Sequence, residues 1–214
     1  MPECPLCYNH QTDVVLKDNI HTYLYCSKCF LRFVHPDDRL DLHEEKSRYD
    51  LHQNDPNDQN YRNFLSQLFE PVQKSLKPGA AGLDYGSGPG PTLHLLFEEA
   101  GFRMDHYDPI YHDDRNLLDG KYDFITVSET AEHFYHPGKE FQMLWHMLNP
   151  GGLLGIMTLL LTDPDQFDNW FYRREDTHVA FYTPDTFRWI ASNLKANPEF
   201  HGNRVILLKK PGSN

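Results

Sequence analysis

The sequence predicts an α/β fold, in which an open and mostly parallel sheet follows a small cysteine-rich unit. From about residue 78 onwards, segments with strand character alternate with segments of helical spacing, which is the pattern of α/β folds. A glycine-rich turn joins the first of these strands to a helix within residues 82–101. All four cysteines lie in the first 29 residues, in two C-x2-C pairs.

The stretch 82–90, with the sequence GLDYGSGPG, is the most informative in the chain. Glycines at every second position let the backbone bend sharply and approach a ligand without a Cβ in the way. Pro91 suits the first turn of the following helix, and Gly101 suits its end. A strand, a glycine turn and a helix in this order form the place where open α/β sheets bind nucleotide-like ligands. A dinucleotide fingerprint needs a third glycine where Pro91 stands.

An acidic residue ends the second predicted strand, residues 102–108. The carboxylate of Asp108 offers two oxygens with about four lone pairs, which suits the two neighbouring hydroxyls of a ribose. An ordinary loop aspartate ahead of Pro109 is the alternative.

The rest of the chain continues the alternation. Residues 122–128 are rich in β-branched and aromatic side chains and predict a strand. Apolar residues at helical spacing follow at 141–148, and the apolar run 153–161 predicts a strand buried on both faces. The same criteria predict the last elements, which are a helix at 186–194 and strands at 198–201 and 203–210.

Together these motifs resemble those of class I methyltransferases that use S-adenosylmethionine (SAM). The similarity rests on the G-x-G-x-G turn, on Asp108, and on the order of the strand YDFITVS, SETAEH, a helix, NPGG and an apolar strand. It covers roughly residues 78–214 and implies a Rossmann-like sheet with helices on both faces and an antiparallel hairpin at its end. It also implies a SAM site formed by Asp84, Gly86, Ser87, Gly88, Pro89, Gly90, Asp108, Ser128 and Glu129.

The cysteine pattern C-x2-C-x18-C-x2-C, formed by Cys4, Cys7, Cys26 and Cys29, has the spacing of a four-cysteine zinc site. Each pair presents two thiolates to one ion, and a hairpin is predicted between the pairs, so the unit resembles a zinc ribbon. Four cysteine ligands leave no open position, and we therefore expect a structural zinc ion. Two disulfides are the alternative, but a chain without a secretion signal points to a reducing compartment.

The chain is expected to divide into three parts, namely the zinc ribbon at 1–36, a linker and lid helix at 37–77, and the methyltransferase domain at 78–214. The helix in the second part starts at 55–58 and has one apolar face. The resemblance implies that it closes over SAM. Tyr49 and His52 are candidates to face the substrate from this lid, with exposure to solvent as the alternative.

Methyl transfer from SAM is an in-line displacement, so alignment supplies much of the catalysis, and only a weakly acidic nucleophile needs a base. The segment from Glu129 through Glu132 to His133 lies at the end of the strand 122–128, where such a group is needed. Glu-x-x-Glu-His also resembles ubiquinone-type O-methyltransferases, which place a divalent cation there, and these side chains are competent metal ligands. Metal ligation, a general base at His133 and a structural cap are three open alternatives.

A second candidate base, His178, lies in the connection 168–184, where aromatic side chains are interleaved with charges. In small-molecule class I methyltransferases this connection often lines the acceptor pocket, and the resemblance implies that role here. Arg173 and Arg174 would then hold an acidic acceptor. The alternative is that the aromatic residues cover the sheet and that the arginines are solvated.

Composition limits the partners. The formal net charge of −11 argues against nucleic acid, because phosphate contacts need a basic surface. The N-terminus lacks the pattern of a signal peptide, and the longest apolar run, 151–161, is too short to span a membrane. We therefore expect a cytoplasmic protein without a membrane segment.

The sequence thus predicts a SAM-dependent methyltransferase that acts on a small molecule and carries zinc. A methyltransferase that modifies protein or RNA, recognised through the ribbon, is the alternative, although the acidic charge argues against RNA. A non-catalytic SAM-binding or adaptor protein is a further alternative, and the intact glycine motif with Asp108 argues against it.

Overall fold

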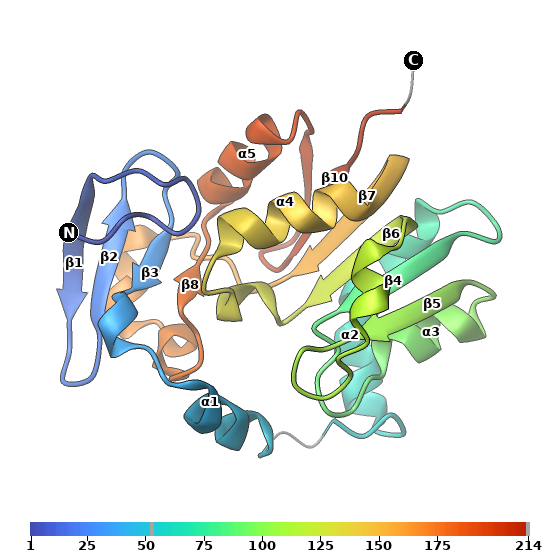
Figure 1. Cartoon of the computed structure of the whole chain (residues 1–214), viewed down its shortest axis with the longest axis horizontal. Coiled ribbons are helices and arrows are strands. Elements are labelled where there is room, and N and C mark those ends of the chain that lie inside the picture. The colour runs from blue at the N-terminus through green and yellow to red at the C-terminus, as the bar shows by residue number, and fades with distance from the viewer. Residues whose placement is uncertain (52–53, 213–214) are drawn as a thin grey trace.

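The computed structural model of the chain describes residues 1–51 and 54–212. Within these ranges, one sheet has six strands in the order β5-β4-β6-β7-β10-β9, and a second has four in the order β1-β2-β3-β8 (Figure 1). The six strands are β4 (Ala81–Tyr85), β5 (Arg103–Tyr107), β6 (Tyr122–Ser128), β7 (Leu148–Met157), β9 (Pro198–His201) and β10 (Val205–Lys209). Strands β5, β4, β6 and β7 are parallel, while β10 runs antiparallel to β7 and β9. The predicted parallel sheet with a final antiparallel hairpin is confirmed.

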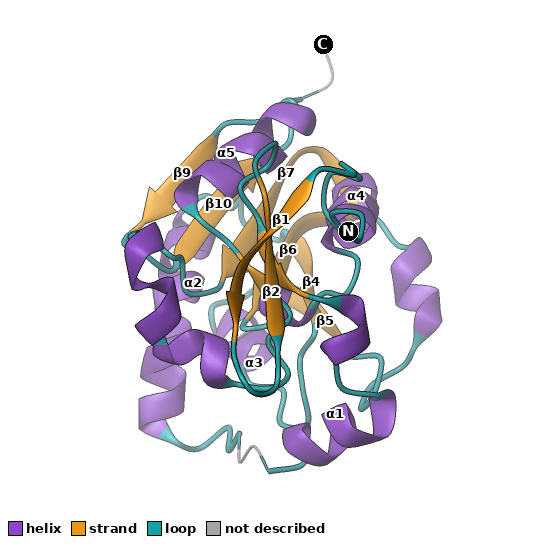
Figure 2. Ribbon diagram, turned by 90° about the vertical axis from the view of Figure 1, so that its left-hand side faces the viewer, coloured by secondary structure: helices purple, strands orange, loops and turns teal. Residues whose placement is uncertain are grey.

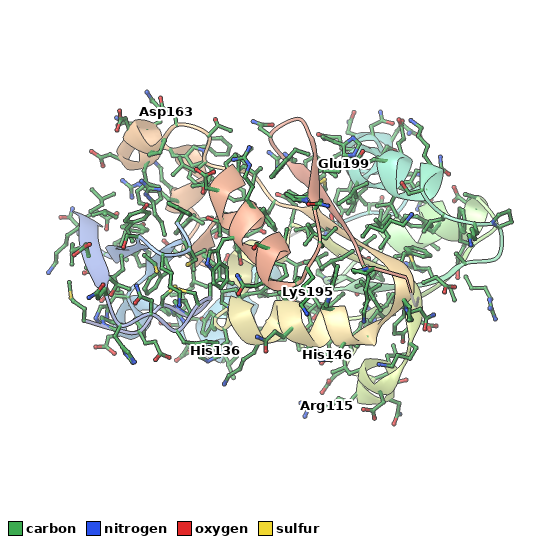
Figure 3. The ribbon with its side chains drawn as sticks, turned by 90° about the horizontal axis from the view of Figure 1, so that it is seen from above. Arg115, His136, His146, Asp163, Lys195 and Glu199 are labelled. Carbon is green, nitrogen blue, oxygen red and sulfur yellow. The ribbon has the colours of Figure 1, made fainter. Side chains whose placement is uncertain are left out.

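Helices cover both faces of the six-stranded sheet, as predicted. One face packs against α2 (Gln59–Lys74) and α3 (Leu93–Glu99), which share an apolar cluster with Phe124 and Leu153. The other face packs against α4 (Pro137–Met147) and α5 (Pro184–Asn193). Figure 2 shows α2 and α4 on opposite sides of the strands. In the view from above, His136 and His146 mark the ends of α4, and Lys195 follows the end of the neighbouring α5 (Figure 3).

Strand β7 begins and ends earlier than the predicted strand 153–161. Its register against β6 shifts between Tyr122, which faces Leu148, and Phe124, which faces Leu153. The NPGG sequence therefore forms an irregular, bulge-like part of the strand rather than a turn before it. The apolar residues after Met157 leave the strand, and they are apolar because they pack in a cluster with side chains of the N-terminal unit.

Helix α3 starts two residues after Pro91, so the prediction that this proline lies in its first turn was wrong. Thr92 is the N-cap and keeps a non-helical backbone, because the chain is still turning away from the glycines. Gly101, with φ of 87°, follows the end of the helix as predicted.

The N-terminal unit contributes β1 (Thr12–Lys17), β2 (Thr22–Cys26) and β3 (Arg32–Val34) to the four-stranded sheet. The fourth strand, β8 (Ala180–Phe181), comes from the far end of the chain and pairs with β3. Side chains of the unit also share one apolar cluster with the six-stranded sheet. The two parts are therefore packed as one body, and the division at residue 36 stays a prediction about independent folding.

A short helix, α1 (Leu42–Tyr49), lies in the stretch expected to be a linker (Figure 1). Asp41 and Glu44 form a capping box at its start, a pattern that the sequence carries. Short 3-10 helices occur at Pro36–Asp38, Arg115–Asp119, Ala131–His133, Pro164–Asn169 and Phe171–Arg174. In the described part of the chain, the helices are too short or too polar to cross a membrane.

Candidate functional site

The glycine turn after β4 has the sharp backbone that the sequence predicts. Gly86 has φ of 80°, and a Cβ on it would lie 2.1 Å from the side chain of Thr130. A Cβ on Gly90 would lie 2.0 Å from the main-chain oxygen of Asn54. Pro89, at the outer side of the turn, is exposed. The segment before α2 therefore crosses directly over the glycine turn, and close approach at these positions excludes a side chain.

Asp108 ties the end of β5 to the glycine turn. Its Oδ2 accepts a hydrogen bond from the N–H of Gly88 at 2.9 Å. Its Oδ1 accepts from the N–H groups of Ile110 and Tyr111 at 2.9 and 3.0 Å. The carboxylate is 8% exposed, so it is fixed beside the turn, and its role toward a ribose stays a prediction.

Asp84 lies at the base of the turn and is 3% exposed. The hydroxyl of Thr126 donates to its Oδ1 at 2.7 Å. Burial raises the pKa of Asp84 to about 7, and the charge of Asp108 adds to this effect. Two hydroxyls near this end of the sheet, at Ser87 and Ser128, have buried oxygens without a hydrogen-bond partner among the described residues.

Glu129 follows β6 with φ of 46°, a left-handed conformation that costs a side chain of this kind on the order of 1–3 kcal/mol. Its carboxylate accepts hydrogen bonds from Arg204 at 2.9 and 3.1 Å. Burial, and then the charge of Glu132, raise its pKa. The strained backbone thus directs a partly buried acid toward Arg204 at the carboxyl end of the sheet.

Glu132, His133 and His178 come together as a cluster in which one ligand-type atom from each lies within 4.8 Å of the others. The rings of His133 and His178 meet edge to face, with centroids 4.8 Å apart. Nδ1 of His133 donates to the Thr177 carbonyl at 2.9 Å, and Nδ1 of His178 donates to the Tyr172 carbonyl at 2.7 Å. Because carbonyls only accept, these bonds place the neutral imidazole lone pairs on Nε2. The two histidines, which are far apart in sequence, therefore belong to one cluster.

Tyr172 completes this cluster. Its hydroxyl donates to Oε1 of Glu132, while Oε2 of Glu132 has no hydrogen-bond partner among the described residues. Glu132 is 1% exposed, and burial raises its pKa. Burial raises the pKa of the Tyr172 phenol as well. The cluster thus contains a buried carboxyl with one oxygen available for a ligand.

Helix α1 lies against the same cluster. The ring of Tyr49 meets that of His133 edge to face, with centroids 5.3 Å apart. Asp50 accepts a hydrogen bond from Tyr111 at 2.6 Å, and Arg48 forms an ion pair with Asp176 at 2.7 Å. Tyr49 therefore contacts His133, and its role toward a substrate stays a prediction, whereas His52 lies outside the described residues.

The two arginines suggested to hold an acidic acceptor differ from each other in their environment. Arg173 is 9% exposed, and its guanidinium is bonded to Asp18 at 2.7 Å and to the main chain of Asp168. Arg174 is exposed. The guanidinium of Arg173 is thus engaged by the N-terminal unit.

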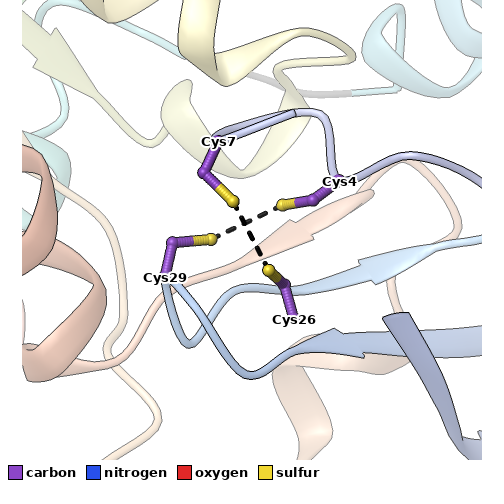
Figure 4. Close-up of side chains that lie close together, drawn as sticks. All are labelled: Cys4, Cys7, Cys26 and Cys29. Carbon is purple, nitrogen blue, oxygen red and sulfur yellow. Dashed lines mark hydrogen bonds between the residues drawn. The ribbon is translucent and has the colours of Figure 1, made fainter. Parts of the chain in front are cut away.

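The four cysteines form a compact, buried group (Figure 4). Sγ of Cys4 lies 3.5 Å from Sγ of Cys29, and Sγ of Cys7 lies 3.4 Å from Sγ of Cys26. These distances exceed a disulfide bond of about 2.05 Å, and the cysteines are free. Main-chain N–H groups donate to the sulfurs of Cys4, Cys7 and Cys29. The group has the donor set of a structural metal centre.

A family model described as a methyltransferase domain matches residues 57–195, which include the glycine turn and the histidine cluster. The chain belongs to this methyltransferase family. No curated protein matches the sequence of this methyltransferase significantly.

Solved structures share the fold of the methyltransferase. A SAM-dependent methyltransferase from Archaeoglobus fulgidus is 17% identical, with a TM-score of 0.54 over 70% of this chain and 94% of that chain. Phosphoethanolamine N-methyltransferase 2 from Haemonchus contortus, in complex with phosphomonomethylethanolamine and S-adenosylhomocysteine, is 13% identical, with a TM-score of 0.51 and coverage of 70% and 52%. An O-methyltransferase family protein from Burkholderia thailandensis has a TM-score of 0.48 at 16% identity over 79% of this chain, which spans 63% of that protein.

Sequence reasoning missed several residues of the methyltransferase site. Tyr172 is one of several aromatic residues in the connection 168–184 that the sequence does not distinguish, and Asn54 and Tyr111 lie in no motif. The capping box before α1 was an available signal for a helix near the site. Contacts of Asn54 with the glycine turn carry no local signal, because they join segments that are distant in sequence.

Proposed function

We propose that this methyltransferase binds SAM against its glycine turn and transfers the methyl group to a small molecule held beside Glu132, His133 and His178. The observation that carries the proposal is a set of buried, unpartnered oxygens among the described residues, on Ser87, Ser128 and Glu132. Each such oxygen costs about 1–3 kcal/mol when it is left unsatisfied. They lie at or just after the carboxyl ends of β4 and β6, where open α/β sheets bind ligands.

The residues around the turn fit SAM. SAM supplies an electrophilic methyl group on a sulfonium. Asp84 offers a buried carboxylate for the positive amino-acid end of this ligand. Oδ1 of Asp108 accepts two N–H bonds and Oδ2 accepts one, so Oδ2 keeps a further lone pair for a ribose hydroxyl.

We propose that Glu132, His133 and His178 hold a divalent cation. The proximity of their ligand atoms supports this, as does the unpartnered Oε2 of Glu132. Main-chain carbonyls orient both imidazoles, as outer partners of metal-binding histidines commonly do. A cation there would lower the pKa of an acceptor hydroxyl. Two imidazoles with one carboxylate suit transition metals such as Co²⁺, Fe²⁺ or Zn²⁺.

A small-molecule acceptor is supported by two observations. The net charge of −11 disfavours nucleic acid. The structural neighbour from Haemonchus contortus is bound to phosphomonomethylethanolamine, a small molecule. Modification of protein or RNA is the competing function.

We also propose that Cys4, Cys7, Cys26 and Cys29 bind one zinc ion. Zinc at about 2.3 Å from each sulfur separates tetrahedral sulfurs by about 3.8 Å. The observed spacing of 3.4 and 3.5 Å needs only a small expansion to accept it. The ion would have a structural role, because four thiolates complete its coordination.

Calorimetry with SAM tests the donor. We expect binding with at least micromolar affinity, and Asp108→Ala should weaken it by roughly 1.5–3 kcal/mol, the scale of hydrogen bonds to a charged group. Asp105→Ala, which removes an exposed carboxylate of β5, serves as the control. Preference for NAD over SAM would contradict the proposal.

Titration with Co²⁺ tests the cation site in protein whose cysteines hold zinc. We expect one further Co²⁺ per chain, without the thiolate absorption that cysteine ligands would give. Glu132→Gln should weaken this binding at least tenfold, while His136→Ala, an exposed histidine nearby, should not. If the chain binds SAM but no additional Co²⁺, a general base at His133 or His178 replaces the cation. An alanine variant of the base would then lose about 10²–10⁴ in turnover.

A further inference from the structure

We infer that the N-terminal four-cysteine unit positions the His178 side of the candidate site, and that Arg173 is a positioning residue through which it does so. The inference rests on the proposed role of His178. It deepens that proposal by assigning to residues 1–36 a function beyond their own folding.

A main-chain path joins the unit to the site. In the antiparallel pair of β3 and β8, Phe33 lies opposite Ala180. The N–H of Val34 donates to the Val179 carbonyl at 3.0 Å, and the N–H of Val179 donates to the Glu132 carbonyl at 2.8 Å. Strand β8 has two residues, and within the four-stranded sheet it pairs with β3 alone. The residue after His178 is therefore held between the N-terminal unit and Glu132.

Side-chain contacts form a second connection between the N-terminal unit and the candidate site. Asp18, in the β1–β2 turn, accepts a hydrogen bond from the Arg173 guanidinium at 2.7 Å. Tyr23 of β2 stacks under this guanidinium, 5.2 Å from its ring centroid, and donates to the Arg173 carbonyl at 3.2 Å. Both the side chain and the main chain of Arg173 are thus fixed by the hairpin.

Fixing Arg173 also fixes its neighbour. The Tyr172 carbonyl, in the peptide that joins the two residues, accepts the Nδ1–H of His178. The Tyr172 hydroxyl donates to Glu132. One residue, held in place by Arg173, therefore orients both the imidazole and the carboxyl of the cluster.

The cysteines hold together the strands of the N-terminal unit that make these contacts. Cys26 ends β2, and Cys29 lies three residues before β3. Tyr23 of β2 and Val34 of β3 pack in one apolar cluster with Tyr172 and Val179. A metal centre at the cysteines would thus set the position of a wall of the candidate site, rather than stabilising a separate appendage.

The tautomer of His178 is the direct readout. Long-range ¹H–¹⁵N spectra of the zinc-loaded full chain, with the His178 signals identified from a His178→Gln variant, should show the Nδ1–H form in the wild type. Arg173→Met and Asp18→Asn should both convert these signals to a mixture of tautomers. Arg174→Met and Asp13→Asn, which change exposed residues of the same segments, should leave them as in the wild type.

Two further measurements separate this inference from the proposed function. Binding of S-adenosylhomocysteine should stay within twofold in all four variants, and Co²⁺ affinity should fall about tenfold in Arg173→Met, as for loss of an outer partner. Unchanged His178 signals in a folded Arg173→Met or Asp18→Asn variant would overturn the inference. Asp18→Asn decides the question if Arg173→Met does not fold. Absence of ligand binding in the wild type would instead count against the proposed function, while the tautomer readout would still test the positioning.

Discussion

At the scale of single residues, buried polar groups gather at the carboxyl ends of β4 and β6. Asp84 is nearly inaccessible and has one hydrogen bond from a neighbouring side chain, that of Thr126. Its position before the turn was predicted from the glycine motif, because the motif fixes where the strand gives way to the turn. The contact between Tyr172 and Glu132 was not predictable, because it depends on the path of a loop 40 residues away in sequence.

Asp84 should make the stability of the ligand-free protein depend on pH. Its folded pKa of about 7 lies above the ordinary carboxyl pKa of 3.8, so the folded state binds an extra proton between these pH values. The stability that the protonated form contributes is complete below pH 4 and is lost as the pH rises through 7. We expect the free energy of unfolding of Asp84→Asn, relative to that of the wild type, to rise by on the order of 2 kcal/mol between pH 5 and pH 8. Urea unfolding at both pH values checks this, and an equal offset at the two would contradict it.

Gly86 should tolerate no side chain, for a reason that a second glycine isolates. Gly86 and Gly79 have similar φ values of 80° and 78°, but a Cβ on Gly79 would meet nothing within 4 Å. Gly79→Ala should therefore cost about 1–2 kcal/mol of backbone strain. Gly86→Ala adds a clash with the side chain of Thr130. It should therefore lower the free energy of unfolding clearly more than Gly79→Ala does, and it should weaken SAM binding. Equal losses in thermal unfolding would show that the turn can relax.

At the scale of elements, α1 and β7 show which features of the fold local sequence signals predict and which depend on contacts between distant segments. The core strands were predictable, because alternation, β-branched residues and glycine turns are local signals. The bounds of β7 were not, because the apolar residues that follow it, such as Leu161, pack with Tyr23 and Val34 of the N-terminal unit instead of continuing the strand. Helix α1 has a cap but little apolar character, so its attachment depends on contacts such as Arg48 with Asp176.

The cap of α1 should control how firmly this helix covers the site. Asp41 accepts hydrogen bonds from His43 and Glu44 at 2.9 Å each. Asp41→Ala should cost about 1 kcal/mol of helix stability and raise amide exchange over residues 42–49 about fivefold. Asp37→Ala, an exposed acid before the helix, is the matched control. Unchanged exchange in Asp41→Ala would mean that tertiary contacts alone hold the helix.

At the scale of the whole molecule, the N-terminal unit and the six-stranded sheet share one core. Buried Cys4, Leu24 and Phe33 belong to the same apolar cluster as Leu83 and Ile125. The cysteine spacing predicted that the four cysteines come together but not this packing, because nothing in either segment specifies its distant partner. The shared core argues against a unit that unfolds alone.

Metal removal should therefore lower the stability of the entire chain. We expect Cys26→Ser to unfold in a single transition, with a melting temperature lower by on the order of 10 °C, corresponding to a loss of several kcal/mol. Elemental analysis should find one zinc in the wild type and none in the variant. Asn9→Ala, beside Cys26, should keep its zinc. A separate transition for the methyltransferase domain, unshifted by the variant, would contradict this expectation.

The pairing of β3 with β8 also sets an order of assembly during synthesis. Tyr23 and Arg173 are 150 residues apart, so a ribosome working at about 5–20 residues per second delivers the partner strand on the order of ten seconds after the hairpin. During that interval the edge of β3 is unpaired and the apolar side chains of Tyr23 and Val34 are uncovered. Early metal capture by the nascent hairpin would protect it from mispairing. The cell's zinc supply would then govern how much of the newly made protein reaches its native form.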